Sequence, residues 1–248
     1  MEKPDIVVFD IDGTLTRSKQ PMAAQISELL LALIRKRKVA IISGAGYDQF
    51  KWQVLDRFSR ESNEFQNLYL LPADGTVFCG FNGEWQCEHD DPLPDEEKKR
   101  IKSVFEKVFE ESGFKKPNEI YGELVEDRGT QLNFSALGQN APIEFKEAWD
   151  PDNKKREQII TALEPVLPGY SMRIGGTTSI EITRIGVDKA YGIGKLLKKT
   201  GISKEKVLYI GDKLFKGGND EPVIALGIKC KEVSGPEETK EIITELLK

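Results

Sequence analysis

The sequence predicts an α/β protein with a parallel β-sheet core, interrupted in the middle of the chain by an inserted α+β layer. Apolar runs at 6–9, 39–42 and 68–71 are separated by helical patterns, which is typical of strands buried on both faces of a parallel sheet. This alternation changes after Leu71 and resumes at Asp188. Strands that alternate with helices favour right-handed crossovers and carry functional sites at the carboxyl ends of the strands.

The first half of the predicted core places polar residues where strands end. The first strand stops at Asp10, and Pro21 opens a helical pattern that ends in the basic segment 35–38, which suits the negative end of a helix dipole. The second strand ends at Ser43, and a further helical pattern follows it. We therefore expect Asp10 and Ser43 at the same edge of the sheet.

The middle of the chain predicts the inserted layer. Asn82-Gly83 between two short strand patterns indicates a β-hairpin. A helix with Ile101, Val104, Phe105 and Val108 on one face follows. The remaining predicted elements of the insert are strands at 120–125, 132–136, 170–174 and 179–182 and a helix near 154–163.

After Asp188 the sequence predicts a helix, a strand at 207–210, a last strand near Ile228 and a C-terminal helix. The predicted organisation is a split core, residues 1–85 and 187–248, with residues 86–186 inserted as a cap domain.

Composition excludes several classes of protein. The 248 residues include 36 Lys+Arg and 41 Asp+Glu, and the net charge of −5 argues against nucleic acid or an anionic membrane surface as the partner. No apolar run approaches the roughly 18 residues that span a bilayer, and the N-terminus lacks the pattern of a signal peptide, so we expect a cytoplasmic protein. Three cysteines without a Cys-x-x-Cys pair, and a single histidine, predict neither a disulfide framework nor a zinc site.

Two carboxylates, Asp10 and Asp12, follow the first strand, and Gly13 after them permits a sharp backbone turn. Beside a divalent cation, one carboxylate stays ionised as a nucleophile while the other can serve as general acid and base. Taken alone, the same pattern is equally typical of a solvated turn.

A second acidic segment at 211–220 follows the strand predicted at 207–210 and contains Asp212, Asn219 and Asp220. It would bring four acids to one sheet edge. Mg²⁺ prefers one or two carboxylates together with water and phosphate oxygens, so Asp10 and Asp212 are sufficient as side-chain ligands. By itself the segment also fits a glycine-rich surface turn.

Two further residues point to phosphate. Ser43 can offer its hydroxyl and neighbouring backbone amides to a phosphate oxygen at a helix N-terminus, although a serine at this position more commonly caps the helix. Lys189, at the start of the helix after the insert, can supply a positive charge to the same phosphate, and a solvated lysine is the simpler alternative.

Together these motifs resemble the haloacid dehalogenase (HAD) superfamily of phosphotransferases. The resemblance implies a HAD-like Rossmannoid core with a C2B-type cap, Asp10 as the nucleophile that forms an aspartyl-phosphate, and Asp12 as the acid and base. It also implies a catalytic Lys189. The phosphate-binding residues that it implies are Ser43, Gly44 and Asn219, and the acids that it implies for Mg²⁺ are Asp10, Asp12, Asp212 and Asp220.

The segment 12–16, the long 211–220 loop and the position of the insert resemble, more narrowly, the eukaryotic-type phosphomannomutases of HAD subclass IIB. This resemblance places sugar-phosphate binding at Arg128, Asn133, Ser179 and Glu181. The chain departs from that family at two positions, because Tyr121 and Gln139 stand where the family carries phosphate-binding arginines.

These departures favour a Mg²⁺-dependent phosphatase acting on a sugar phosphate. A mutase must hold a bisphosphorylated sugar both ways round, and fork-shaped arginines supply that hold, so phosphomannomutase activity is the alternative. Two further hypotheses are a dinucleotide-binding turn at 44–46 and a non-catalytic sensor of a phosphosugar or Mg²⁺, and both leave residues of the acidic constellation unexplained. The expected partner is a small phosphosugar, and the resemblance makes a homodimer through the cap plausible.

Overall fold

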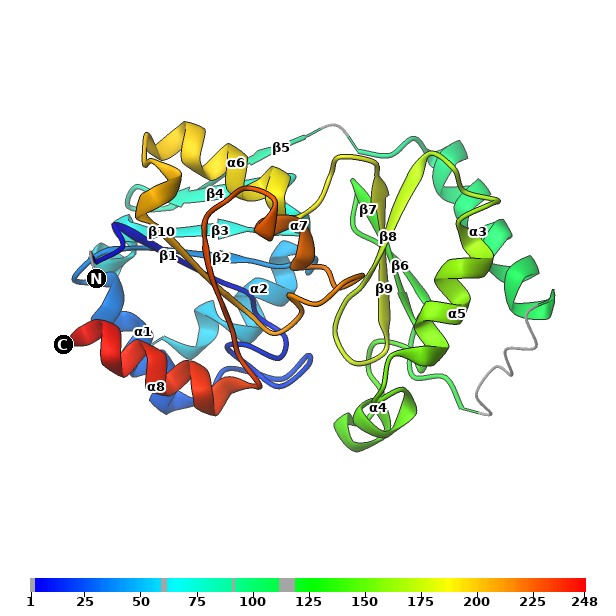
Figure 1. The fold of residues 1–248 in the computed structure, drawn as a ribbon, viewed down its shortest axis with the longest axis horizontal. Helices are drawn as coiled ribbons and strands as arrows, with labels where there is room; N and C mark the ends of the chain where they lie inside the picture. Colours follow the sequence, from blue (N-terminus) through cyan, green and yellow to red (C-terminus); the bar gives the residue numbers. More distant parts are fainter. Residues whose placement is uncertain (1–2, 59–61, 91, 112–118) are drawn as a thin grey trace. The chain divides into compact units, whose positions relative to one another are not determined.

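The structure is a computed structural model, and it describes residues 3–58, 62–90, 92–111 and 119–248 (Figure 1). The chain forms two compact units. The first comprises Met1–Asp90, Asp188–Lys216 and Asp220–Lys248, and the second comprises Asp91–Val187 and Gly217–Asn219. No helix in the described ranges is long and apolar enough to cross a membrane.

The first unit contains a 7-stranded sheet with the order β11-β10-β1-β2-β3-β4-β5. Its strands are β1 Ile6–Phe9, β2 Lys38–Ile42, β3 Leu68–Leu71, β4 Val77–Phe81, β5 Trp85–His89, β10 Val207–Gly211 and β11 Lys229–Glu232. The five strands from β11 to β3 pair in parallel, as the sequence predicted, while β4 and β5 add an antiparallel hairpin at one edge.

Helices cover both faces of this sheet. They are α1 Ala24–Ile34, α2 Tyr47–Gln53, α6 Lys189–Thr200, the short α7 Glu221–Ile224 and α8 Pro236–Leu247. Alternate residues of each strand point to opposite faces, so Val7 and Phe9 join the apolar cluster that includes α1 and α8, whereas Ile6 and Val8 join the one that includes α6. Figure 1 shows α1 and α8 side by side. Burial of each such side chain contributes about 1.5–3 kcal/mol to the stability of the folded protein. This packing holds the strands in place, and with them the strand ends that carry the polar residues.

The second unit is built on a 4-stranded antiparallel sheet with the order β6-β7-β9-β8. Its elements are α3 Asp95–Glu111, β6 Val125–Asp127, β7 Gln131–Ser135, α4 Ile143–Trp149, α5 Lys154–Leu163, β8 Tyr170–Ile174 and β9 Ser179–Arg184. Residues of α3 and α5 pack on one face of the sheet, where the Phe105 and Phe134 rings stack with centroids 5.2 Å apart.

Two details of this unit differ from the prediction. The prediction of a strand at 120–125 is wrong, because β6 begins only at Val125. The preceding residues form a loop in which the Tyr121 N–H donates to the Leu137 carbonyl and Gly122 takes a positive φ of 91°. Helix α4 was not predicted, since its seven residues carry no continuous apolar face and Phe145 is 55% exposed.

The expectation that the cysteines form no disulfide is also wrong. Cys79 and Cys87 face each other across β4 and β5 and are joined by a disulfide, with their Cα atoms 4.1 Å apart. The hairpin around Asn82-Gly83, which the sequence did predict, sets this register. Cys230 is a free thiol.

Protein purified without reductant and then denatured should therefore show one reactive thiol per chain, from Cys230, and three after reduction. Titration of thiols with a chromogenic reagent measures both values. Three thiols before reduction in oxidised, air-exposed protein would contradict the pairing of Cys79 with Cys87.

Candidate active site

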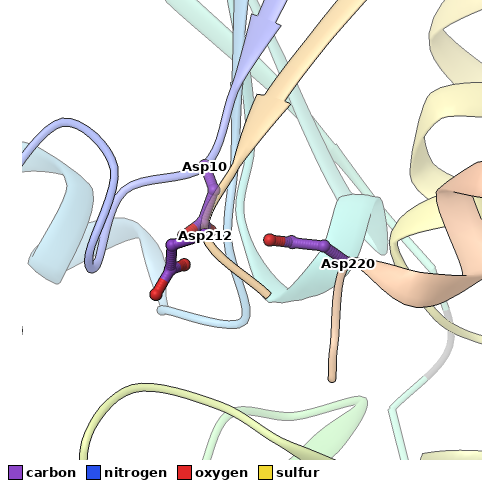
Figure 2. A group of neighbouring side chains, drawn as sticks. All are labelled: Asp10, Asp212 and Asp220. Atoms are coloured by element: carbon purple, nitrogen blue, oxygen red, sulfur yellow. The ribbon is translucent and has the colours of Figure 1, made fainter. Parts of the chain in front are cut away.

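Three carboxylates meet at the carboxyl edge of the core sheet. Asp10 follows β1, and Asp212 follows β10, its parallel neighbour, which pairs Phe9 with Ile210. Asp220 stands directly before α7. One carboxylate oxygen from each of the three lies within 4.8 Å of the others. Figure 2 shows Asp220 pointing toward the strand ends where Asp10 and Asp212 stand.

Lys189 ties two of these acids together. Its ammonium nitrogen Nζ lies 2.6 Å from Oδ1 of Asp10 and 2.6 Å from Oδ1 of Asp220, and the residue has no exposed surface. Lys189 is the first residue of α6, where the helix dipole disfavours a positive charge. The two carboxylates offset this cost and the larger cost of burying an ammonium group.

The pKa directions follow from this packing. Burial raises the pKa of Asp10 well above its usual range, the Lys189 ammonium opposes the rise, and the neighbouring carboxylates add to it. Burial also raises the pKa of Asp212, against the pull of Lys213. For Asp220 burial acts in the same direction, but Lys189 and the hydrogen bonds it receives outweigh burial, so its pKa is lowered.

Asp220 owes its ionised state to a complete set of donors. Besides Lys189, the buried Tyr209 hydroxyl donates to Oδ1 at 2.5 Å, and the backbone N–H of Lys213 donates to Oδ2 at 2.9 Å. Burial and the Asp220 charge raise the pKa of Tyr209 well above its usual value, so it stays a donor. Asp220 is thus the fixed anion of the group.

The donor set fits Mg²⁺. Carboxylate oxygens are the hard ligands that Mg²⁺ prefers, and the buried Oδ1 of Asp212 has no hydrogen-bond partner. The missing side chain at Gly13 lets this carboxylate lie directly against the backbone of residue 13. A Cβ atom there would lie 2.2 Å from Oδ2 of Asp212, and the φ of +89° also favours glycine. Asp10, Asp212 and Asp220 are therefore the residues that would hold the ion.

Asp12 lies outside this group of three. Its Oδ1 accepts hydrogen bonds from the Lys19 N–H at 2.7 Å and from the Gln53 side-chain amide at 3.0 Å. Gln53 is fully buried and also donates to Thr16 and to the Gln20 carbonyl. The side chain of Asp12 is thus held apart from Asp10, Asp212 and Asp220.

Ser43 and Gly44 occupy the turn between β2 and α2, next to β1 in the sheet. The Ser43 hydroxyl accepts the Ala45 N–H at 3.2 Å, and the Ser43 carbonyl accepts the N–H of Asp74 at 3.0 Å. These bonds fix the turn at the same edge of the sheet as Asp10.

In the second unit, three of the four predicted sugar-binding residues share the polar face of the sheet. Asn133 on β7 pairs in register with Glu181 on β9, and Ser135 pairs with Ser179, whose hydroxyls lie 3.2 Å apart. Arg128 instead lies in the turn between β6 and β7 and binds Glu126 through Nε and Nη2.

Asn219 was predicted to bind phosphate. Its side-chain amide donates to both carboxylate oxygens of Glu181, at 3.2 and 3.0 Å. Its backbone N–H donates to Ile174 at 3.2 Å, and the Ile174 N–H donates to Gly217 at 3.2 Å. The segment just before Asp220 therefore packs with β8 and β9 of the second unit.

Sequence reasoning missed the residues that position the site through packing. Gly192 of α6 touches the turn after β3: a Cβ on Gly192 would lie 2.4 Å from the Asp74 carbonyl, and one on Gly75 would lie 2.3 Å from the Gly192 Cα. This close approach determines how near α6 lies to the turn after β3, and hence where Lys189 is placed. Tyr209 and Gln53 were also missed, because neither belongs to a motif. A tyrosine within an otherwise apolar strand is the one sequence feature that could have indicated Tyr209.

Comparison with known proteins gives a family match. The family described as haloacid dehalogenase-like hydrolase matches residues 7–223. Among curated proteins, phosphomannomutase 2 of Dictyostelium discoideum is 29% identical over 227 residues, covering 88% of this chain and 86% of its own length. The phosphomannomutase of Saccharomyces cerevisiae is 27% identical over 260 residues, covering 99% of this chain and 95% of its own length.

Solved structures share the fold. The IMP-nucleotidase of Plasmodium falciparum superposes with a TM-score of 0.72 at 19% identity, covering 99% of this chain and 68% of that one. A haloacid dehalogenase-like hydrolase from Bacteroides thetaiotaomicron gives 0.58 at 16% identity, covering 98% and 100%. The predicted fold class, a HAD-like α/β protein with a mostly parallel core sheet, is confirmed.

Replacing Gly192 by Ala should lower the free energy of unfolding by about 2 kcal/mol, since the added methyl group overpacks against the Asp74 backbone. Gly194, on the same helix, is the matched control, because nothing lies within 4 Å of a Cβ there. Gly194→Ala should instead stabilise by about 0.5–1 kcal/mol through helix propensity. Urea denaturation measures both, and equal effects of the two variants would contradict the close approach.

Replacing Asp212 by Asn should stabilise the metal-free protein near neutral pH. A carboxyl group whose pKa is raised by folding destabilises the native state above that pKa, so removing the charge relieves this cost. The gain is on the order of 1 kcal/mol, or about 2–4 °C in Tm. The variant should also lose most of the Tm increase that Mg²⁺ gives the unmodified protein. Thermal unfolding with and without Mg²⁺ measures both effects, with the exposed Asp56→Asn as control.

Proposed function

We propose, since the chain belongs to the haloacid dehalogenase-like hydrolase family, that this enzyme is a Mg²⁺-dependent phosphohydrolase acting on a sugar phosphate through an aspartyl-phosphate on Asp10. The observation that carries the proposal is the buried arrangement of Asp10, Lys189 and Asp220, with both carboxylates 2.6 Å from one ammonium group. A carboxylate held in this way is oriented for attack, and the Lys189 ammonium opposes the rise that burial causes in the pKa of Asp10.

In the first half-reaction, a carboxylate oxygen of Asp10 attacks phosphorus in line with the ester oxygen. The bond between Asp10 and phosphorus forms as the bond from phosphorus to the ester oxygen breaks. Asp12, entering this step protonated, gives its proton to the departing oxygen of the sugar. The bonds from Lys19 and Gln53 to Asp12 hold it in position for that transfer.

In the second half-reaction, Asp12 takes a proton from water as the water oxygen attacks phosphorus. The bond between phosphorus and Asp10 breaks, which releases inorganic phosphate and restores both carboxyl groups to their starting states. Lys189 provides positive charge beside the reacting group, and the turn at Ser43 and Gly44 offers backbone amides to the phosphoryl oxygens. Mg²⁺ held by Asp10, Asp212 and Asp220 would supply further charge stabilisation for phosphoryl transfer.

Hydrolysis is favoured over mutase action by the residues at 121 and 139. The Tyr121 ring lies 6.5 Å from the Phe145 ring, and the Gln139 carbonyl accepts the Lys146 ammonium at 2.7 Å. Neither position offers the bidentate guanidinium that a mutase would use on a second phosphate. Recognition of the sugar is assigned in this proposal to Arg128, Asn133, Ser179 and Glu181.

Phosphomannomutase activity is the second candidate. It is favoured by the relatives of that name, which align with nearly the whole chain at 24–29% identity. Both activities share the first half-reaction and differ in whether water or a sugar hydroxyl receives the phosphoryl group.

The two candidates are separated by their products. We expect purified protein, given mannose 1-phosphate and Mg²⁺ with or without a sugar bisphosphate, to release free phosphate without accumulating mannose 6-phosphate. Mannose 6-phosphate formed without matching release of phosphate would contradict hydrolysis and support the mutase. If neither product forms, mannose 1-phosphate is not the substrate, and Mg²⁺-dependent hydrolysis of an aryl phosphate then tests the reaction class.

Asp10→Asn should lower turnover by a factor on the order of 10³ or more, because an amide cannot form the covalent intermediate. Asp56→Asn, which changes an exposed acid in the same unit, should leave turnover unchanged. Steady-state kinetics of both variants in Mg²⁺ give the comparison. Full turnover in Asp10→Asn would contradict the mechanism.

A further inference from the structure

Lys213 contacts two of the acids that would hold Mg²⁺. It follows Asp212 in the chain, and its backbone N–H donates to Oδ2 of Asp220 at 2.9 Å. In return, the Asp220 N–H donates to the Lys213 carbonyl at 3.3 Å. These two bonds close the loop from 213 to 220, so the backbone of Lys213 is fixed beside the acidic group.

The side chain of Lys213 binds the other acid. Its ammonium nitrogen Nζ lies 3.0 Å from Oδ2 of Asp212, and the two side chains are only 14% and 15% exposed. Water and salt screen a pair at this depth less than a pair on the open surface. The Lys213 charge therefore acts strongly on Asp212 in the folded protein.

Asp212 differs from its two neighbours in the donors that it receives. Asp10 and Asp220 both accept the buried ammonium group of Lys189. At Asp212, Oδ1 is buried without a hydrogen-bond partner, and Oδ2 accepts the ammonium group of Lys213. The bond from Lys213 is thus the contact at Asp212 that a metal ion would have to replace.

Charge makes this contact a competitor of the metal. One carboxylate oxygen from each of Asp10, Asp212 and Asp220 lies within 4.8 Å of the others. An ammonium group bound to one of these carboxylates weakens its attraction for a divalent cation and also repels the cation directly. Lys189 is fully buried and tied to two acids, whereas Lys213 is partly exposed and has a flexible four-carbon stem. Of these two lysines, Lys213 is therefore the one that can withdraw.

We propose that Lys213 occupies Asp212 in the metal-free enzyme and must withdraw its ammonium group before that carboxylate can serve as a metal ligand. Lys213 thereby sets the Mg²⁺ concentration at which the site fills. The inference rests on the metal site of the proposed function. Binding of the ion is measured without turnover, so a failure of the hydrolysis assay leaves this test intact.

Calorimetric titration of metal-free protein with MgCl₂ tests the proposal. Lys213→Gln should lower the Kd for Mg²⁺ about tenfold, because one positive charge beside the ion is removed. Lys213→Met, a second neutral variant, should give the same result. Lys216→Gln makes the same change in net charge at an exposed lysine of the same loop, and should leave the Kd nearly unchanged.

Lys213→Arg distinguishes the charge from a role in shaping the loop. It keeps the positive charge and should therefore keep the Kd of the unmodified protein. Thermal unfolding of each metal-free variant checks that it is folded. Binding that appears in Lys213→Gln but is absent from the unmodified protein would support the proposal in its strongest form.

Three results would overturn the proposal. The first is binding of Mg²⁺ to Lys213→Gln and Lys213→Met that is no tighter than binding to Lys216→Gln. The second is tightening of the same size in Lys213→Arg. The third is an absence of binding in both the unmodified protein and Lys213→Gln at about 10 mM Mg²⁺.

Discussion

The buried ammonium group of Lys189 is the interaction on which the core site depends. Its Nζ lies 2.6 Å from Asp10 and 2.6 Å from Asp220, and its charge opposes the effect of burial on the pKa of both carboxyl groups. Three elements must be in register for this contact to exist: β1 delivers Asp10, α6 delivers Lys189, and the segment after β10 returns Asp220 to the same point. The parallel pairing of β1 with β10 and the close approach of Gly192 to the turn after β3 set these positions.

The three acids are not equivalent, and their differences follow from their donors. Asp220 receives bonds from Lys189, Tyr209 and a backbone N–H, so it is the permanent anion. Asp212 has an oxygen without a donor and a raised pKa, which is the state of a ligand suited to a cation. The chain between these two acids includes Gly217–Asn219, which pack with the second unit, where Asn219 binds Glu181.

Periodicity was sufficient to predict the core, because parallel strands buried on both faces leave continuous apolar runs at 6–9 and 207–210 that nothing else explains. Strand ends then located Asp10 and Asp212. What periodicity could not supply were contacts between distant parts of the chain: the bond from Gln53 to Asp12, the hydroxyl of Tyr209 on Asp220, and the Gly75–Gly192 contact. The disulfide was out of reach, because Asn82-Gly83 is the signal of a two-residue loop, whereas the three-residue loop found in the structure is what sets Cys79 opposite Cys87. Helix α4 was out of reach because its aromatic residue Phe145 is exposed and joins no apolar core cluster.

The central claim is that Asp10 carries the phosphoryl group during turnover. Its most direct test is rapid acid quenching of the enzyme with Mg²⁺ and a hydrolysed phosphate ester, followed by peptide mass spectrometry. The account predicts a phosphoryl group on the peptide that contains Asp10, localised to that side chain and absent when chelator replaces Mg²⁺. Undiminished turnover with no phosphoryl group on Asp10, or with the group on another residue, would contradict it.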